Sequence, residues 1–238
     1  GAYSFGSYDS KPYILLNYTN TLKDVFTIVH EMGHSMHSFY TRKTQPFAYG
    51  DHSIFTAEVA STVNESLLMQ HLLAKETDAE MRKYLINYYI EEFRTTLFRQ
   101  TMFAEFEMLT HREVENGGVL TAKWLCDVYD DLNKKYFGPA LSEDEYIRYE
   151  WARIPHFYRA FYVYQYATGY SAATAISKRI LTEGEPARKD YIEFLKSGSS
   201  DYPVALLKIA GVDMSSPEPI RMAMETFKGL VDELEKLL

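Results

Sequence analysis

The sequence predicts a mainly α-helical domain with one short β segment near its N-terminal end. Beyond residue 21, apolar side chains recur at spacings of three and four, which is the period of an amphipathic helix. The run PYILLNYT, residues 12–19, is short, apolar and aromatic and begins at a proline, which is typical of a strand. The 238 residues, 46% of them hydrophobic, are enough to bury one substantial core.

The helices are expected in a definite order. The first covers residues 22–40, where an acidic residue in the first turn (Asp24) complements the helix dipole. Its apolar stripe consists of Val25, Val29, Met32, Met36 and Phe39. Residues 41–53 have the composition of a loop. Further helices are predicted at about 54–75, 77–115, 121–137, 157–184, 187–198, 202–211 and 218–238. No internal boundary is visible, so one domain over 1–238 is expected.

Charge and cysteine content exclude some partners and locations. A net charge of −8 argues against nucleic acid or an anionic membrane surface as a partner. One cysteine, Cys126, rules out an intramolecular disulfide and fits a reducing compartment, so a cytoplasmic location is expected. No apolar run approaches membrane-spanning length, and the first residues lack a signal-peptide pattern. Because the chain begins without Met, we expect a piece of a longer protein.

The stretch TIVHEMGHSMHSFY, residues 27–40, carries the main functional signal. In a helix His30 and His34 are one turn apart and point the same way, so both imidazoles can reach one ion. Glu31 lies about 100° round the helix from His30, beside such an ion rather than on it. A carboxylate there can take a proton from a water that the metal activates. The spacing therefore predicts a metal site with Glu31 as its base.

A catalytic zinc site needs a third protein ligand. His37 is too far along the helix axis, about 10 Å beyond His30, so we expect it to be packed instead. In the next predicted helix Glu58 lies among apolar residues, which are poor surroundings for a solvated charge, and it is the preferred third ligand. Glu65, two turns later, is better placed to orient a ligand histidine through a hydrogen bond. Two loop residues, Asp51 and His52, remain alternatives.

A family resemblance rests on HEMGHSMHSF and on FTAEVASTVNESLL, which are similar to the oligoendopeptidase F branch of the thimet-oligopeptidase-like zinc peptidases, family M3. The flanking GAYSFGSYDSKPYILLNYTNTLKDVFTIVHE and IPHFYRAFYVYQYATGYSAA resemble it as well, so the similarity covers most of residues 1–180. It implies a zincin-like, all-helical, deep-channel catalytic domain with the short β segment near the active site, zinc held by His30, His34 and Glu58, and Glu31 as general base. It also implies cleavage of short unfolded peptides, with the β segment pairing with the substrate backbone.

The stretch PHFYRAFYVYQY, residues 155–166, offers neutral hydrogen-bond donors for an oxyanion. In one continuous helix Tyr158, Tyr162 and Tyr166 share a face at spacing four. The resemblance implies that a histidine and one or more tyrosines from this region stabilise the transition state. We assign this role to His156 and Tyr162, with Tyr158 next, and expect Tyr166 to belong to the core.

These observations together predict a zinc-dependent endopeptidase acting on oligopeptides, with cobalt or manganese as acceptable substitutes for zinc. Family members are usually well over twice this length, so the chain resembles the C-terminal catalytic portion, with the missing N-terminal part as a partner. One alternative is a metallocarboxypeptidase or dipeptidase of similar helical fold, in which Arg148, Arg153 or Arg159 grips the substrate carboxylate. Another is a non-catalytic helical fragment that binds peptides or metal.

Overall fold

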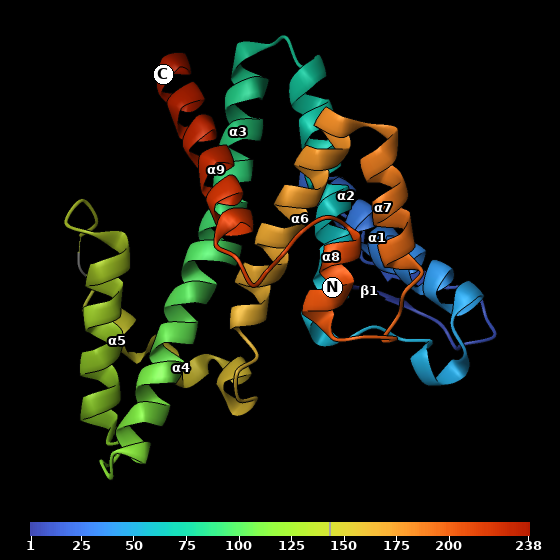
Figure 1. The fold of residues 1–238 in the computed structure, drawn as a ribbon. Helices are drawn as coiled ribbons and strands as arrows, with labels where there is room; N and C mark the ends of the chain where they lie inside the picture. Colours follow the sequence, from blue (N-terminus) through green and yellow to red (C-terminus); the bar gives the residue numbers. More distant parts are fainter. Residues whose placement is uncertain (143) are drawn as a thin grey trace. The chain divides into compact units, whose positions relative to one another are not determined.

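The computed structural model describes residues 1–142 and 144–238, which form two compact units. Unit 1 comprises residues 1–91 and 168–238, and unit 2 comprises residues 92–167. Helix α3 (Ala79–Phe93) carries the chain from unit 1 into unit 2, and α6 (Tyr164–Glu183) carries it back (Figure 1). The expected mainly helical class with a short β segment is confirmed. In the described part of the chain, no helix is both long and apolar enough to cross a membrane.

Unit 1 begins with a β-hairpin that lies against the first helix. Strand β1 (Ala2–Phe5) pairs antiparallel with β2 (Tyr13–Leu16), which is the strand expected from the sequence. The Oγ atoms of Ser4 and Ser35 are hydrogen-bonded at 2.8 Å, which ties the hairpin to α1 (Leu22–Thr44). The β segment therefore lies beside the residue that follows His34.

The N-terminus of α1 is held by one carboxylate. Oδ2 of Asp24 accepts hydrogen bonds from the backbone N–H and the hydroxyl of both Thr19 and Thr21, at 2.8 to 3.0 Å. These bonds lower the pKa of Asp24 to about 2. The charged carboxylate thus occupies the position where backbone N–H groups have no helical partner.

The buried face of α1 is not the apolar stripe that predicted the helix. Most of that stripe is exposed, whereas Phe26, Gly33, His37 and Thr41 are buried. The buried side packs against α2 (Ile54–Lys75) and α7 (Glu185–Leu195), and the Thr41 hydroxyl donates to the Leu195 carbonyl at 2.9 Å. Small and polar residues suit this face because the neighbouring helices approach closely.

Gly33 marks the closest approach of α1 and α2. A Cβ added there would lie 2.5 Å from the Cα of Ser61 and 2.7 Å from the carbonyl oxygen of Ala60. A side chain of any size therefore forces the two helices apart. Helices α2, α6, α7 and α8 (Pro203–Ile209) contribute residues to the core of unit 1. Helix α9 (Glu218–Leu237) comes after α8 in the sequence. The core includes Val59, Val63, Ala172, Ile176, Phe194, Leu195 and Leu207.

In the residues that the structure describes, unit 2 contains two long helices, one π segment and two 3-10 segments. Its elements are the π-helical segment η2 (Arg94–Phe98), α4 (Arg99–Glu115), α5 (Ala122–Phe137), η3 (Ile147–Arg153) and η4 (Pro155–Tyr158). The helix predicted over residues 77–115 is thus interrupted by a π segment. Aromatic residues dominate the core between α4 and α5, with Phe103, Phe106 and Tyr129 buried.

The helix predicted from about Phe157 is wrong in its first turns, because α6 begins at Tyr164. Phe161 has a backbone φ of 56°, a left-handed conformation that costs a non-glycine residue about 1–2 kcal/mol and that no helix continues through. Its N–H donates to the carboxylate of Glu107 on α4. A partner so distant in sequence is invisible to a local pattern, which explains the error.

Candidate metal centre

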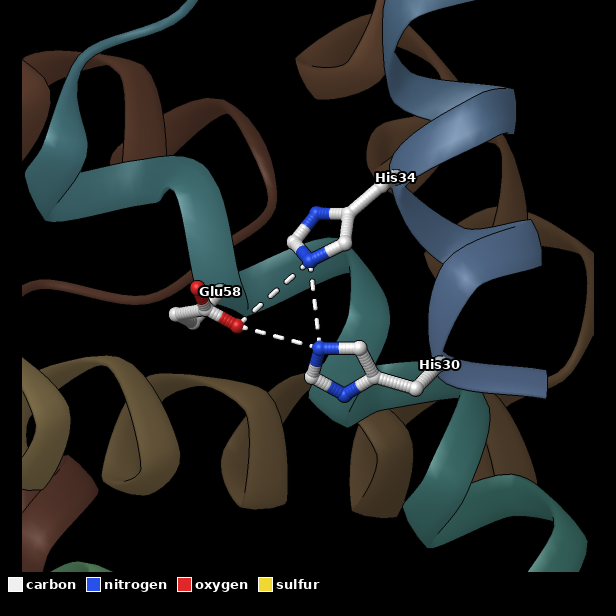
Figure 2. Close-up of side chains that lie close together, drawn as sticks. All are labelled: His30, His34 and Glu58. Carbon is white, nitrogen blue, oxygen red and sulfur yellow. Dashed lines mark hydrogen bonds and ion pairs between the residues drawn. The ribbon is translucent and has the colours of Figure 1, made fainter. Parts of the chain in front are cut away.

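Three side chains of unit 1 converge at the contact between α1 and α2. Figure 2 shows the imidazoles of His30 and His34 and the carboxylate of Glu58 pointing toward one another. The two Nε2 atoms are 3.1 Å apart, and Glu58 Oε2 lies 3.3 Å from His30 Nε2 and 3.5 Å from His34 Nε2. A zinc ion about 2.0–2.1 Å from each donor, with tetrahedral angles, separates the donors by about 3.3–3.4 Å. The donor set therefore fits one zinc ion.

The two helices deliver these ligands by different means. On α1 the spacing of four residues places the two histidines on one face. On α2 the Glu58 carboxylate lies close to the two histidines because Gly33 of α1 allows close contact at Ser61. The Ser61 hydroxyl also donates to Glu58 Oε2 at 3.2 Å. The Asn64 side chain donates to the Val29 carbonyl at 3.3 Å, a second link between the helices beside the site.

Glu65 lies on the other side of the His30 ring. Its Oε1 is 3.3 Å from Nδ1 of His30, while Nε2 of the same ring faces Glu58. A carboxylate on the remote nitrogen fixes the tautomer and orientation of a ligand histidine. The geometry is thus the one expected for Glu65 from its position two turns after Glu58.

The charges around His30 favour a cation. Burial lowers the pKa of His30, yet Glu58 and Glu65 outweigh it and raise this pKa to about 10. Burial likewise raises the pKa of Glu58, but its bonds to His30 and His34 hold it well below the usual range. Two carboxylates thus give the imidazoles a negative surrounding, in which a metal ion and protons compete for the same nitrogens.

Glu31, the expected base, is buried on α1 with an exposed fraction of 7%. No hydrogen bond or ion pair joins its carboxylate to any residue in the part of the chain that the structure describes. A poorly exposed carboxylate without a protein partner is unfavourable unless water or a ligand satisfies it. The Glu31 carboxylate is thus available to a water or a ligand.

The other candidate ligands lie outside the cluster. His37 is 1% exposed and stacks on His52 with ring centroids 4.2 Å apart. The Asp51 side chain is 85% exposed and lies 3.7 Å from His52 Nδ1. Within residues 1–142 and 144–238, the group placed to share a metal ion is His30, His34 and Glu58.

In unit 2, the aromatic stretch forms a ring cluster of His156, Tyr162 and Tyr166. The His156 and Tyr162 rings stack with centroids 5.7 Å apart, and Tyr166 meets both edge-on at 6.0 and 5.5 Å. The Tyr166 hydroxyl donates to that of Tyr162 at 3.3 Å. Tyr158 is 89% exposed and does not belong to this cluster. The spacing of four residues between Tyr162 and Tyr166 was the sequence signal that could have identified this pair. The same spacing separates Tyr158 from Tyr162, so spacing alone could not show that Tyr166, and not Tyr158, joins the cluster.

Comparisons with known proteins show what the chain is similar to. The model of the family described as Peptidase family M3 matches residues 1–226. Oligopeptidase PepF of Bacillus subtilis is 58% identical over the whole chain, and an oligoendopeptidase F homologue of Lactococcus lactis is 50% identical. The chain spans 36% and 40% of their lengths. The crystal structure of oligoendopeptidase F from Enterococcus faecium matches 91% of this chain and 39% of its own, with 49% identity and a TM-score of 0.82.

Proposed function

The chain belongs to peptidase family M3, as its motifs indicated, and on that premise we propose that it is a zinc-dependent endopeptidase for short unfolded oligopeptides. The observation that carries the proposal is the convergence of His30, His34 and Glu58 within 3.1 to 3.5 Å, with the unpartnered Glu31 on the same helix. The relatives' names give an oligopeptidase and an oligoendopeptidase, which supports this class of substrate.

His30, His34 and Glu58 would hold the zinc ion, and Glu65 would orient His30. A zinc ion in such a site makes water acidic enough to attack at neutral pH and polarises the carbonyl that is attacked. The sequence expectation that cobalt or manganese can replace zinc stays a prediction.

Glu31 moves the proton. Its carboxylate takes a proton from the attacking water as the water oxygen bonds to the peptide carbonyl carbon, and gives that proton to the leaving amine nitrogen as the C–N bond breaks. His156 and Tyr162 donate hydrogen bonds to the oxyanion that forms between these steps. Tyr158 remains the next candidate for this role.

The proposed partners follow from the same premise. They are oligopeptide substrates and the remaining part of a longer protein, since the chain spans well under half of its relatives. We also propose that the hairpin β1–β2 pairs with the substrate backbone, and that one catalytic domain comprises residues 1–238. The net charge of −8 disfavours nucleic acid and membrane partners, and the single free Cys126 favours the cytoplasm.

The test is Glu31→Gln in the zinc-loaded chain, both alone and with the N-terminal part of a relative added. We expect hydrolysis of internally quenched peptides to fall by about 10²–10⁴-fold, because the proton acceptor is lost, while elemental analysis shows unchanged zinc. Glu193→Gln is the control, since that exposed residue pairs with Lys196 on the surface of unit 1. Retained turnover in Glu31→Gln contradicts the assignment.

Substrates blocked at both ends separate an endopeptidase from a carboxypeptidase or dipeptidase, because only an endopeptidase cleaves them. The structure weakens two of the three cations considered for an exopeptidase, and the third, Arg159, lies over the Tyr162 ring at 6.0 Å. The Arg148 guanidinium lies 2.7 Å from Asp127, and Arg153 pairs with Glu150, so both cations already have carboxylate partners. A zinc-bound chain that cleaves no peptide even with the N-terminal part present would indicate the non-catalytic alternative.

A further inference from the structure

The turn that precedes α6 contains an unusual backbone conformation. Phe161 adopts a φ of 56°, which bulky residues rarely do. It lies between η4 and α6, directly before Tyr162. Residues in such conformations persist where surrounding contacts hold them, and they concentrate at functional sites. What holds Phe161 therefore also decides where Tyr162 points.

One holding contact is a buried carboxylate. Glu107 on α4 is 5% exposed, and its Oε1 accepts the Phe161 N–H at 2.5 Å. A buried carboxylate is unfavourable without hydrogen bonds, and a charged acceptor makes the bond stronger than one between neutral groups. The bond fixes the backbone at the residue whose conformation ends the predicted helix.

Two further contacts fix the same turn from its other sides. His111, one helical turn after Glu107, has its ring 4.7 Å from the ring of Phe161. Val163 is fully buried in the core of unit 2 together with Phe106. With Phe161 held at its N–H and ring and Val163 in the core, the intervening Tyr162 is held next to His156.

We propose that Glu107 is a positioning residue of the peptidase, acting through Phe161 to set the geometry of the His156–Tyr162–Tyr166 cluster. The catalytic role of that cluster rests on the proposed function. The claim that Glu107 sets the position of Tyr162 beside His156 does not depend on that function. The Glu107 side chain is buried and its carboxylate binds the Phe161 N–H, so its effect reaches the reaction through the turn.

The experiment compares Glu107→Ala, Glu107→Gln and Glu105→Ala in the zinc-loaded chain. Gln keeps an oxygen that can accept the Phe161 N–H. Glu105 is the matched control, because it is on the same helix and its carboxylate binds Lys135 and Tyr136 instead, at 2.6 to 2.8 Å. The measurements are NMR exchange of the Phe161 amide, NMR contacts between the His156 and Tyr162 rings, and kcat and KM below the melting temperature.

In Glu107→Ala we expect amide exchange at Phe161 to accelerate by at least about tenfold and the His156–Tyr162 contacts to be lost. We expect kcat to fall about tenfold to hundredfold with a smaller change in KM, since the cluster acts on the transition state. Glu107→Gln should recover most of both effects, and Glu105→Ala should show neither. A purely structural role would lower the melting temperature and leave kcat of the folded protein unchanged.

Retained ring contacts in Glu107→Ala, or equal losses in Glu105→Ala, overturn the proposal. A wild-type chain that cleaves no peptide even with the N-terminal part present contradicts the proposed function alone, since amide exchange and ring contacts still decide whether Glu107 sets the turn. A final check uses Phe161→Gly, which removes the conformational strain. In that background Glu107→Ala should reduce kcat by less than it does beside Phe161, and an undiminished loss counts against the proposal.

Discussion

The metal centre and the aromatic segment reach their geometry in different ways. In unit 1, His30 and His34 converge because a regular helix repeats its direction every four residues. In unit 2, His156 and Tyr162 come together across a turn that no helix period describes. The spacing of four residues along one helix is enough to bring His30 and His34 together. The arrangement in unit 2 depends on Glu107, far away in the sequence.

This contrast implies different sensitivities. Substitutions in the metal centre should act through the ligands themselves and through the distance between α1 and α2. Substitutions in the aromatic segment should leave the metal in place and alter only the rate. The following changes test that separation, from the largest expected effect to the smallest.

Glu58→Ala should abolish activity by removing the third ligand, so that zinc is lost on dialysis as measured by elemental analysis. Glu65→Gln should act more mildly, lowering zinc affinity by about 10–100-fold, because its carboxylate orients His30 rather than binding the ion. Full zinc content in Glu58→Ala would show that another residue is the third ligand. The proposed set of metal ligands would then be wrong.

Tyr162→Phe should lower kcat by about 10²–10³-fold through loss of one hydroxyl donor, while zinc content stays unchanged. Tyr146→Phe is the control, since that tyrosine is exposed in the same unit and lies outside the cluster. Loss of zinc from Tyr162→Phe would show that the two regions are not separable. An equal loss of rate in Tyr158→Phe would instead show that Tyr158, ranked after Tyr162 from the sequence, contributes as much as Tyr162.

Gly33→Ala should lower the free energy of unfolding by about 1–3 kcal/mol, because its Cβ meets the backbone of Ser61 at 2.5 Å. Moving α2 also displaces Glu58, so zinc affinity should fall together with stability. Gly169→Ala provides the control on α6, where the nearest atoms lie at 4.0 Å and alanine favours the helix. Chemical denaturation and zinc titration of both variants measure the difference; equal behaviour would exclude close helix contact as a determinant of the site.

Asp24→Asn should show the smallest effect and a defined pH dependence. The pKa of Asp24 is lowered to about 2 by its hydrogen bonds, so the carboxylate stabilises the fold above its usual pKa of 3.8 and loses this contribution as pH falls toward 2. The melting temperature of the variant should therefore lie below that of the wild type near pH 7, and the difference should shrink on acidification. Asp9→Asn, at an exposed position in the hairpin loop, should show no such trend.

The sequence was most informative where structure is local. His-Glu-x-x-His lies on a predicted helix, and the apolar neighbours of Glu58 indicated that its helix packs against another. The structure brings His30, His34 and Glu58 together. The strand β2 was visible in the apolar run PYILLNYT, whereas its partner β1, also four residues long, includes a serine between aromatic residues and carries no clear pattern. Phe161 ends a predicted helix because of a carboxylate on another helix, and no local pattern contains that information.

The path of the chain through the two units has a consequence for synthesis. During synthesis, residues 92–167 leave the ribosome before the helices that complete unit 1. Helices α1 and α2 therefore lack their contact with α7, including the bond from Thr41 to Leu195, until α7 has been made. Residues 76–195 are about 120 residues, which at about 5–20 residues per second take about 6 to 24 s to make. During that interval the face of α2 that carries Val59 and Val63 lacks its covering helices. A ribosome-bound chain of this kind is therefore a good substrate for chaperones that bind exposed apolar helices.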